Sequence, residues 1–515
     1  MAPGSCNPHN PPQYGILSFS KLESGVTNPN TPIIVGVAQV LNRVQTLEDA
    51  VEPLGMMLQA VALAQRDTGA RGLLPQVQSV RVIRGVWNYA NPARHIAREI
   101  GASGAQTVGT LFGGNQNQAI VNRTALSILS GELDLVLLTG AEYGKSAGKA
   151  RKAGKKIPLT ETPGEYDLII GAQKPEHHEY EIAKGIRSAI QVYPMYDNAI
   201  RHHRGETLDA HLLRVSTLWS RFNDVARTNP NAWIQENVTA EEIRTPSRTN
   251  RRISFPYTKL MNANMSVDMG AALIMCSVAK ARKLGISEQK WVYPYAGAEG
   301  YDHFSASVRD NFYSSPGIGI VGRAVLALAE TETGDLAYVD LYSCFPSAVQ
   351  IAAEELGLTE NMDLTVTGGL TFGGGPINNY VMHSIARMVE LLREHPGTRG
   401  LITANGGNLY KHAHGVYSSE PPAHDFRFKN VQAEIDALPS RECLAEYRGD
   451  ASIESYTVMF AGDEPAIAHV ACLTPQGQRV WVNCEDKQLM AAMISEEFCG
   501  RRARVDSNGG FRISS

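Results

Sequence analysis

The hydrophobic residues of this chain form short runs that alternate with longer segments of helical periodicity. Apolar runs occupy residues 33–37, 77–83 and 135–138. Apolar residues recur every three or four positions in the segments between them, for example at residues 92–100 and 117–130. Strands that alternate with helices predict an α/β fold, in which a mostly parallel sheet is covered by helices on both faces.

One helix-and-strand pattern occurs twice. Residues 119–141 and residues 380–407 each contain a helical segment, a short glycine turn and an apolar string that ends in glycine. Each helical segment follows a glycine-rich turn, at residues 112–115 and 372–376. We interpret the pair as an internal duplication of one α/β layer, and the alternative is a chance match at a few positions.

Three other parts of the chain differ in composition. Residues 1–30 are rich in Pro, Asn, Gly and Ser and predict a loose tail. Residues from about 144 to 252 are polar, with intermittent helical segments such as 208–225, and indicate either a functional lid or a flexible excursion. From about residue 440 onward, short strand-like runs predict a small β-barrel-like domain.

Composition and charge narrow the class of protein. The 48 basic and 52 acidic residues give a net charge of -4, which excludes nonspecific binding of a polyanion by the whole surface. The seven cysteines are scattered and contain no C-x-x-C pair, so we expect a reducing compartment without a disulfide framework. No leader pattern and no run of about 18 apolar residues is found. We therefore expect a soluble cytoplasmic protein that neither spans a membrane nor binds nucleic acid.

Several motifs resemble those of the thiolase superfamily. Residues 31–37 resemble its first strand, and residues 265–272 resemble the Ser-x-x-Asp-Gly-Ala-Ala stretch that ends its first half. Residues 256–259 and 341–345 are similar to the sterol-carrier-protein branch, whose matching turn reads Leu-His-Asp-Cys-Phe. Residues 367–376 resemble the segment that ends in Gly-His-Pro. The resemblance covers roughly residues 31 to 420.

This resemblance implies a five-layered αβαβα fold built from two duplicated halves, and Claisen or retro-Claisen chemistry on acyl-coenzyme A (acyl-CoA) thioesters. The implied halves are residues 31–290, including the insertion at about 144–252, and residues 291–425. An OB-like β domain at 440–515 follows them. The closest resemblance is to the acetyl-CoA acetyltransferase-like, or type 1 thiolase-like, proteins, some of which carry an extra C-terminal domain.

Three positions depart from the pattern of active thiolases. The family's nucleophilic cysteine corresponds to Gly114, its activating histidine to Gly375 and its second cysteine to Ala404. Glycine cannot form a thioester, so a cysteinyl acyl-enzyme is not expected at this turn.

The remaining candidates for catalysis follow the predicted strand at residues 337–341. Cys344 matches a cysteine of the related branch that is a candidate acid/base group, and its alternative role is a small buried apolar side chain. Tyr342 and Ser343 can each donate one hydrogen bond to a thioester oxygen, but neither is a strong base near neutral pH.

Two histidines are candidate bases. His383 lies four residues after Asn379, on a helical face away from the apolar stripe, and either looks into the site as a general base or faces solvent. His412 follows the Gly-Gly turn at residues 406–407, where the family places its last catalytic loop, and we prefer it as a second polar group.

Glycines and basic residues supply candidate binding groups. Gly113, Gly114, Gly374 and Gly375 precede predicted helices, where free N–H groups hold an oxyanion or where glycine only permits a tight turn. The resemblance implies a CoA ligand, whose phosphates a basic segment can bind, although a solvated loop is the alternative. The candidate CoA-binding residues are Lys145, Lys149, Arg151, Lys152, Arg251 and Arg252.

Two functions of different classes remain open. The first is an enzyme that transfers or cleaves the acyl group of a CoA thioester without the usual cysteine. The second is a noncatalytic CoA-ester-binding protein or an assembly subunit, as a homodimer or with a partner. We expect acyl-CoA as the small-molecule ligand, no tightly bound cofactor, and no metal, because the paired histidines lack a third ligand at a diagnostic spacing.

Overall fold

The computed structural model describes residues 28–172, 175–506 and 510–513, so the predicted tail lies almost wholly outside the described residues. A first sheet has the strand order β1-β8-β4-β2-β3-β5. Its strands are β1 (Pro32–Leu41), β8 (Asp268–Ser277), β4 (Leu135–Tyr143), β2 (Ser79–Val82), β3 (Gln106–Thr110) and β5 (Leu168–Ile170). β8 is antiparallel to β1 and β4, whereas β4, β2, β3 and β5 are parallel. The sheet is therefore mixed, with β1 and β5 at its edges.

A second sheet repeats this arrangement. Its order is β10-β11-β12-β9-β13, with bounds β10 (Leu336–Asp340), β11 (Arg399–Gly406), β12 (Lys411–Ser418), β9 (Tyr293–Tyr301) and β13 (Arg427–Asn430). The path β9-β12-β11-β10 has the same sequence of antiparallel, antiparallel and parallel pairs as β1-β8-β4-β2. This correspondence confirms the predicted duplication.

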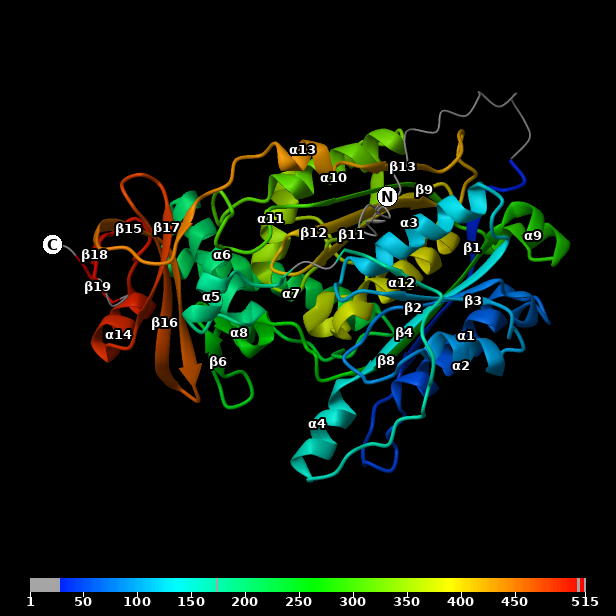
Figure 1. Ribbon diagram of the computed structural model, residues 1–515, viewed down its shortest axis with the longest axis horizontal. Coiled ribbons are helices and arrows are strands. Elements are labelled where there is room, and N and C mark those ends of the chain that lie inside the picture. The colour runs from blue at the N-terminus through cyan, green and yellow to red at the C-terminus, as the bar shows by residue number, and fades with distance from the viewer. Residues whose placement is uncertain (1–27, 173–174, 507–509, 514–515) are drawn as a thin grey trace, which may run out of the picture.

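The helices complete five layers (Figure 1). α3 (Gln116–Leu129) and α12 (Tyr380–Glu394) contact both sheets and form the central layer. α1 (Pro53–Thr68) and α2 (Pro92–Glu99) cover the outer face of the first sheet, and α10 (Pro316–Leu328), with α11 (Pro346–Leu356) beside it, covers the second. Ile120, Leu138 and Val381 belong to the fully buried central core. The predicted αβαβα fold is confirmed.

Residues 144–252 are more helical than the sequence pattern predicts. They contain α4 (Gly144–Lys152), α5 (Glu179–Ala183), α6 (Ala189–Arg204), α7 (Leu208–Thr228) and α8 (Ala240–Arg244), besides strand β5. In α6 the polar residues Asp197, Asn198 and Arg201 are buried together with its apolar residues. From Val192 to Arg201 every residue is buried, so no polar face of this part of the helix meets solvent, and this hides its periodicity. Within the described ranges, no helix combines the length and apolarity that crossing a membrane requires.

The C-terminal region is rich in β-structure, as predicted. Its sheet has the order β14-β17-β16-β15-β18-β19, from β14 (Cys443–Leu444), β17 (Arg479–Cys484), β16 (Glu464–Leu473), β15 (Gly449–Ala461), β18 (Arg502–Val505) and β19 (Phe511–Ile513). The strands β6 (Arg252–Ser254) and β7 (Tyr257–Thr258) extend it from the first half of the chain. The short helix α9 (Val278–Lys283) follows β8, α13 (Gln432–Asp436) follows β13, and α14 (Lys487–Ser495) follows β17. In Figure 1 this domain lies at the end opposite α1 and α2.

Helix α6 joins the C-terminal domain to the two-sheet body. Its Met195 carbonyl accepts a hydrogen bond from Ser455 Oγ at 2.5 Å, and Asn198 Nδ2 donates to the Tyr456 carbonyl at 2.7 Å. The same helix holds the turn between β11 and β12, because Tyr196 Oη donates to the Asn408 carbonyl at 3.0 Å. One helix therefore fixes both the C-terminal domain and the turn next to the candidate site.

Candidate functional site

The glycine turn before α3 lies against residues of the second half. A methyl group added at Gly114 would overlap the hydroxyl oxygen of Tyr342 and lie 2.5 Å from the Asn405 carbonyl oxygen. Gly406 packs on the same turn, since a methyl group there would lie 3.2 Å from the Gly114 nitrogen. Tyr342 therefore occupies the space into which a side chain at position 114 would project.

Tyr342 and Cys344 follow strand β10 and retain a small exposed fraction. Burial raises the pKa of the Cys344 thiol to about 12, and hydrogen bonding by Tyr193 and Asn405 offsets only part of this rise. Burial also raises the pKa of Tyr342 well above its usual value. Both side chains therefore stay protonated near neutral pH, and they can donate hydrogen bonds but are poor bases.

Two other elements position these groups. Asn405, at the end of β11, donates from Nδ2 to the hydroxyl oxygen of Tyr193 at 3.0 Å, and that hydroxyl donates to the Gly407 carbonyl at 3.1 Å. Ser343 Oγ accepts the backbone N–H of Leu370 at 3.3 Å and so fastens the glycine-rich segment after it. Ser343 is thus a structural contact in this conformation, while Tyr193 and Asn405 complete the site around Cys344.

The predicted histidines are not directed at Cys344. His383 and Asn379 share a face of α12, but that face packs on the first sheet: Nδ1 of His383 lies 2.9 Å from Gln39 Oε1, and Asn379 Nδ2 donates to the Gly140 carbonyl at 2.8 Å. Burial lowers the pKa of His383 to about 3, which keeps the ring neutral. The expected solvent or site exposure of that face is therefore absent, because the first sheet covers it.

His412 comes closer to the site than His383. It pairs with Asn405 across the β11–β12 ladder, so the two side chains leave the same face of the second sheet. Its Nε2 lies 3.4 Å from Asp302 Oδ2, and both residues are buried. A proton-transfer role for His412 stays a prediction, since the ring is directed at Asp302.

A shallow depression of about 250 Å³ lies where α4 begins after β4. Its lining residues, which we name the cationic depression, are Arg43, Val44, Gln45, Lys145, Lys149 and Trp233. The Lys145 ammonium lies 5.3 Å from the centre of the Trp233 ring and forms no salt bridge with any described residue. Lys149 Nζ donates to the carbonyls of Val44 and Gln45 at 2.9 and 2.8 Å. The depression is suited to an anion beside an aromatic plane.

The other candidate cations lie elsewhere. Arg151 and Lys152 are exposed on the last turn of α4 and do not line the depression. Arg252 stacks on Phe460 of the C-terminal domain at 5.8 Å, and Arg251 Nη1 donates to the Arg252 carbonyl at 3.2 Å. The structure therefore brings Lys145 and Lys149 together and separates Arg251 and Arg252 from them.

The second glycine turn links the cationic depression to the residues after β10. A methyl group at Gly369 would lie 2.8 Å from Ser343 Oγ, and the Gly373 carbonyl accepts the N–H of Trp233 at 3.0 Å. Gly374 has φ +110° and packs on Met269, with 2.5 Å between an added methyl group and its sulfur. Gly375 donates its N–H to the Asn264 carbonyl at 3.0 Å. Close packing therefore accounts for these two glycines, and a role for them in holding an oxyanion stays a prediction.

Sequence reasoning missed four residues of this region. Arg43 and Trp233 lie in loops that carry no motif, and Tyr193 and Asn405 meet Cys344 only through the tertiary fold. A signal existed for Asn405 alone, because it follows the position that corresponds to the family's second cysteine. The others required the three-dimensional structure.

Two duplicated α/β layers with a pseudo-equivalent glycine turn in each define a protein of the thiolase fold. Residues 430–510 match the family model described as the thiolase-like protein type 1 additional C-terminal domain. The monomeric SCP2-thiolase-like protein type 1 of Mycobacterium smegmatis is 30% identical, with a TM-score of 0.82 over 95% of this chain and 100% of that one. The chain belongs to the SCP2-thiolase-like protein type 1 family.

More distant structures share the fold. The Ltp2-ChsH2(DUF35) aldolase is 20% identical, with a TM-score of 0.57 over 76% of this chain and 99% of that one. Human mitochondrial 3-ketoacyl-CoA thiolase is 14% identical, with a TM-score of 0.54 over 76% and 100% of the two chains. No curated protein sequence matches this chain.

Proposed function

We propose that this protein binds CoA thioesters without forming an acyl-enzyme. The observation that carries the proposal is the cationic depression, where the Lys145 ammonium lies beside Trp233 with no carboxylate partner among the described residues. The nucleotide phosphates would pair with Lys145, and the adenine would pack on the indole ring. The pantetheine arm would then run toward Tyr342 along the glycine-rich segment that contacts both Trp233 and Ser343.

The residues around the thioester end favour binding over covalent catalysis. Gly114 offers no nucleophile, and the raised pKa of Cys344, about 12, leaves its thiol almost entirely protonated. His383 is neutral and packed on the first sheet, and His412 is directed at Asp302. A general base is therefore not positioned at Cys344 by the described residues in this conformation.

Acyl transfer by Claisen or retro-Claisen chemistry is the second candidate. It is supported by the Tyr342 hydroxyl, which adjoins Gly114 at the start of α3 and forms no hydrogen bond with a described residue. A phenol and the free N–H groups of a helix start can together stabilise an enolate or a thioester oxyanion. One protein of the same fold is an aldolase by its description, which supports carbon–carbon chemistry as a candidate activity here.

Calorimetry with CoA and acetyl-CoA tests the binding proposal. The Lys145 ammonium has no hydrogen-bond or salt-bridge partner among described residues, so Lys145→Met removes charge with little structural cost. We expect it to weaken binding about tenfold, whereas Lys152→Met, on the exposed end of α4, has less than about a twofold effect. Binding that is absent in the wild type, or equal in the Lys145 variant, refutes the proposal.

Mass spectrometry with acetoacetyl-CoA and longer 3-oxoacyl-CoAs separates the two candidates. A pure binding protein leaves every substrate intact. Turnover by the wild type that is lost in Tyr342→Phe establishes the second candidate. Turnover that survives in Tyr342→Phe and is lost in Cys344→Ala assigns the chemistry to the thiol.

A further inference from the structure

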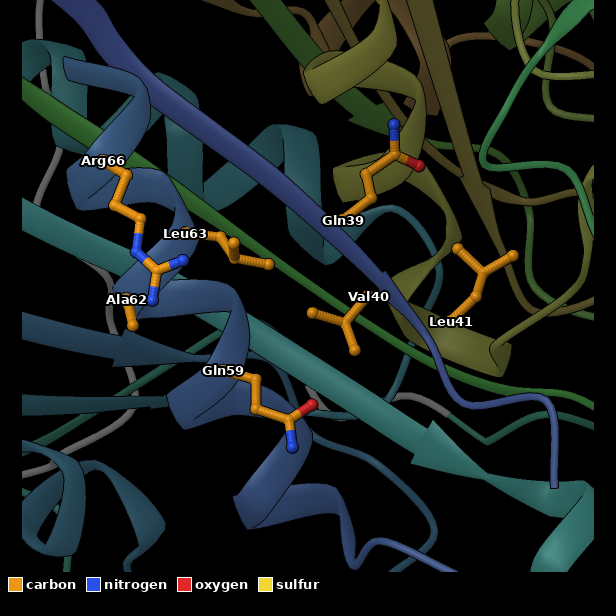
Figure 2. Close-up of a pocket in the computed structure, with 7 residues that line it drawn as sticks. All are labelled: Gln39, Val40, Leu41, Gln59, Ala62, Leu63 and Arg66. Atoms are coloured by element: carbon orange, nitrogen blue, oxygen red, sulfur yellow. The ribbon is translucent and has the colours of Figure 1, made fainter. Parts of the chain in front are cut away.

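A groove runs between the free edge of the first sheet and the outer helix α1 (Figure 2). Its volume is about 440 Å³. The helix contributes residues at positions i, i+3, i+4 and i+7, which form one stripe facing the strand. The lining residues are Gln39, Val40 and Leu41 of β1 and Gln59, Ala62, Leu63 and Arg66 of α1. The floor is largely apolar, and Leu63 is 38% exposed.

The backbone of β1 is open along this groove. From Gly36 onward, the even-numbered residues of β1 point their N–H groups at β8. Asn42, directly after the strand, continues this pattern, because its N–H donates to the Asp268 carbonyl at 2.9 Å. The odd-numbered residues point outward, and the N–H of Val37 is capped by Asp67 Oδ2 at 2.9 Å. Gln39 and Leu41 therefore direct their N–H and C=O groups into the groove, where no described residue is bonded to them.

Asp67 sets the limit of the open edge. Lys290 Nζ and Arg393 Nη1 hold its two oxygens at 2.8 and 2.7 Å, which fixes the cap on Val37. The edge is therefore closed at Val37 and open from Gln39 to Leu41. An incoming strand of about four to five residues would cover this length.

Positive charge lies at both ends of the groove. Arg66 lies at the end of the groove that is nearer to Val37, and it forms no salt bridge with a described residue. Beyond Leu41, the Arg43 guanidinium donates to the carbonyls of Ala232 and Trp233 at 2.7 and 2.9 Å and has no carboxylate partner among the described residues. Two cations without acidic partners favour an acidic group at each end of a ligand.

We propose that this groove binds an extended polypeptide segment of a partner protein by strand addition to β1. The outward N–H and C=O groups of Gln39 and Leu41 would supply the main-chain hydrogen bonds. The apolar floor would accept alternate apolar side chains, and Arg66 and Arg43 would select segments with acidic residues at the ends. The proposed peptide site and the cationic depression share Arg43, but the contacts expected at Gln39, Leu41 and Arg66 lie outside the depression, so this inference does not depend on CoA binding.

Fluorescence polarisation with labelled hexapeptides tests the proposal. The probe is Glu-Val-Thr-Val-Thr-Glu, and the matched controls carry lysine at both ends or proline in place of the central valine. We expect the acidic probe to bind with a dissociation constant below roughly 1 mM and both controls to bind at least about tenfold more weakly. Arg66→Glu should weaken the acidic probe about tenfold or more, whereas Arg98→Glu, exposed on α2, should not.

Hydrogen exchange locates the contact directly. The amides of Gln39 and Leu41 should exchange more slowly when the acidic probe is bound, and the capped amide of Val37 should not change. Leu41→Pro removes the outward N–H without removing a bond to β8, and it should abolish binding while circular dichroism stays native. Absence of binding at roughly 1 mM, protection at another surface, unchanged affinity in Arg66→Glu, or pairing of two copies through this edge overturns the proposal.

Discussion

Replacing Arg479 by methionine is expected to lower the free energy of unfolding by about 3–5 kcal/mol. The Arg479 guanidinium is fully buried and donates to both carboxylate oxygens of Glu454, each at 2.6 Å. It also donates from Nη1 to the carbonyls of Ala306, Ser307 and Arg309 at 3.0, 2.8 and 2.6 Å. Methionine keeps much of the side-chain volume, so the cost comes from the unpaired Glu454 charge and from carbonyls without donors.

Urea unfolding provides the assay. Trp481 reports on the same contact, because its Nε1 donates to Ser307 Oγ at 2.9 Å. Arg504→Met is the matched control: its ion pair with Asp450, at 3.6 Å, joins side chains that are 69% and 78% exposed. We expect that control to leave the unfolding midpoint unchanged, because exposed ion pairs contribute little.

The double variant Arg479→Met with Glu454→Gln sharpens the test. Glu454→Gln removes the carboxylate charge that Arg479→Met leaves unpaired, and this should recover part of the lost free energy of unfolding. The double variant should therefore be less destabilised than the sum of the two single variants. A decrease in the free energy of unfolding below about 1 kcal/mol for Arg479→Met, or strict additivity with Glu454→Gln, would refute this reasoning. The buried pair would then contribute little to holding the C-terminal domain on residues 306–309.

Three further predictions concern Glu142, which is buried near the end of β4, and Gly114 and Cys344 of the candidate site. Burial raises the pKa of Glu142 to about 8, so the folded state retains this proton between pH 4.5 and 8 and loses stability as pH rises through that window. Glu142→Gln should remove this slope, worth at most about 5 kcal/mol, in melts at pH 5 and 8. Gly114→Ala should cost about 1–3 kcal/mol, and adding Tyr342→Phe should restore part of it in thermal unfolding. Native Cys344 should react with iodoacetamide at pH 8 about a thousandfold more slowly than a small thiol, as peptide mass spectrometry would show, because its pKa is about 12.

The fold was largely predictable because both halves repeat a visible local pattern. The helices α3 and α12 carry apolar residues at helical spacing, the strands β4 and β11 contain short apolar runs, and a glycine turn precedes each of these elements. Helix α6 was not predicted, because Asp197, Asn198 and Arg201 are buried by partners from the C-terminal domain and α11. Periodicity reveals a helix only when one of its faces meets water.

The site was predictable in position and only partly in detail. Tyr342 and Cys344 follow a recognisable strand, so the sequence could place them at its carboxyl end. Helical spacing correctly put Asn379 and His383 on one face, but it could not tell that the first sheet covers that face. Spacing along the chain says which side chains share a direction, whereas their surroundings depend on segments hundreds of residues away.

The packing of Tyr342 and the Asn405 carbonyl against Gly114 also limits how this turn can evolve. A single mutation that introduced a cysteine at position 114 would place its side chain in occupied space, so its first effect would be a loss of stability rather than a new activity. A thiol at this turn would need a smaller residue at 342 and a displaced peptide at 405 beforehand. The order in which mutations can accumulate here is therefore set by packing rather than by chemistry.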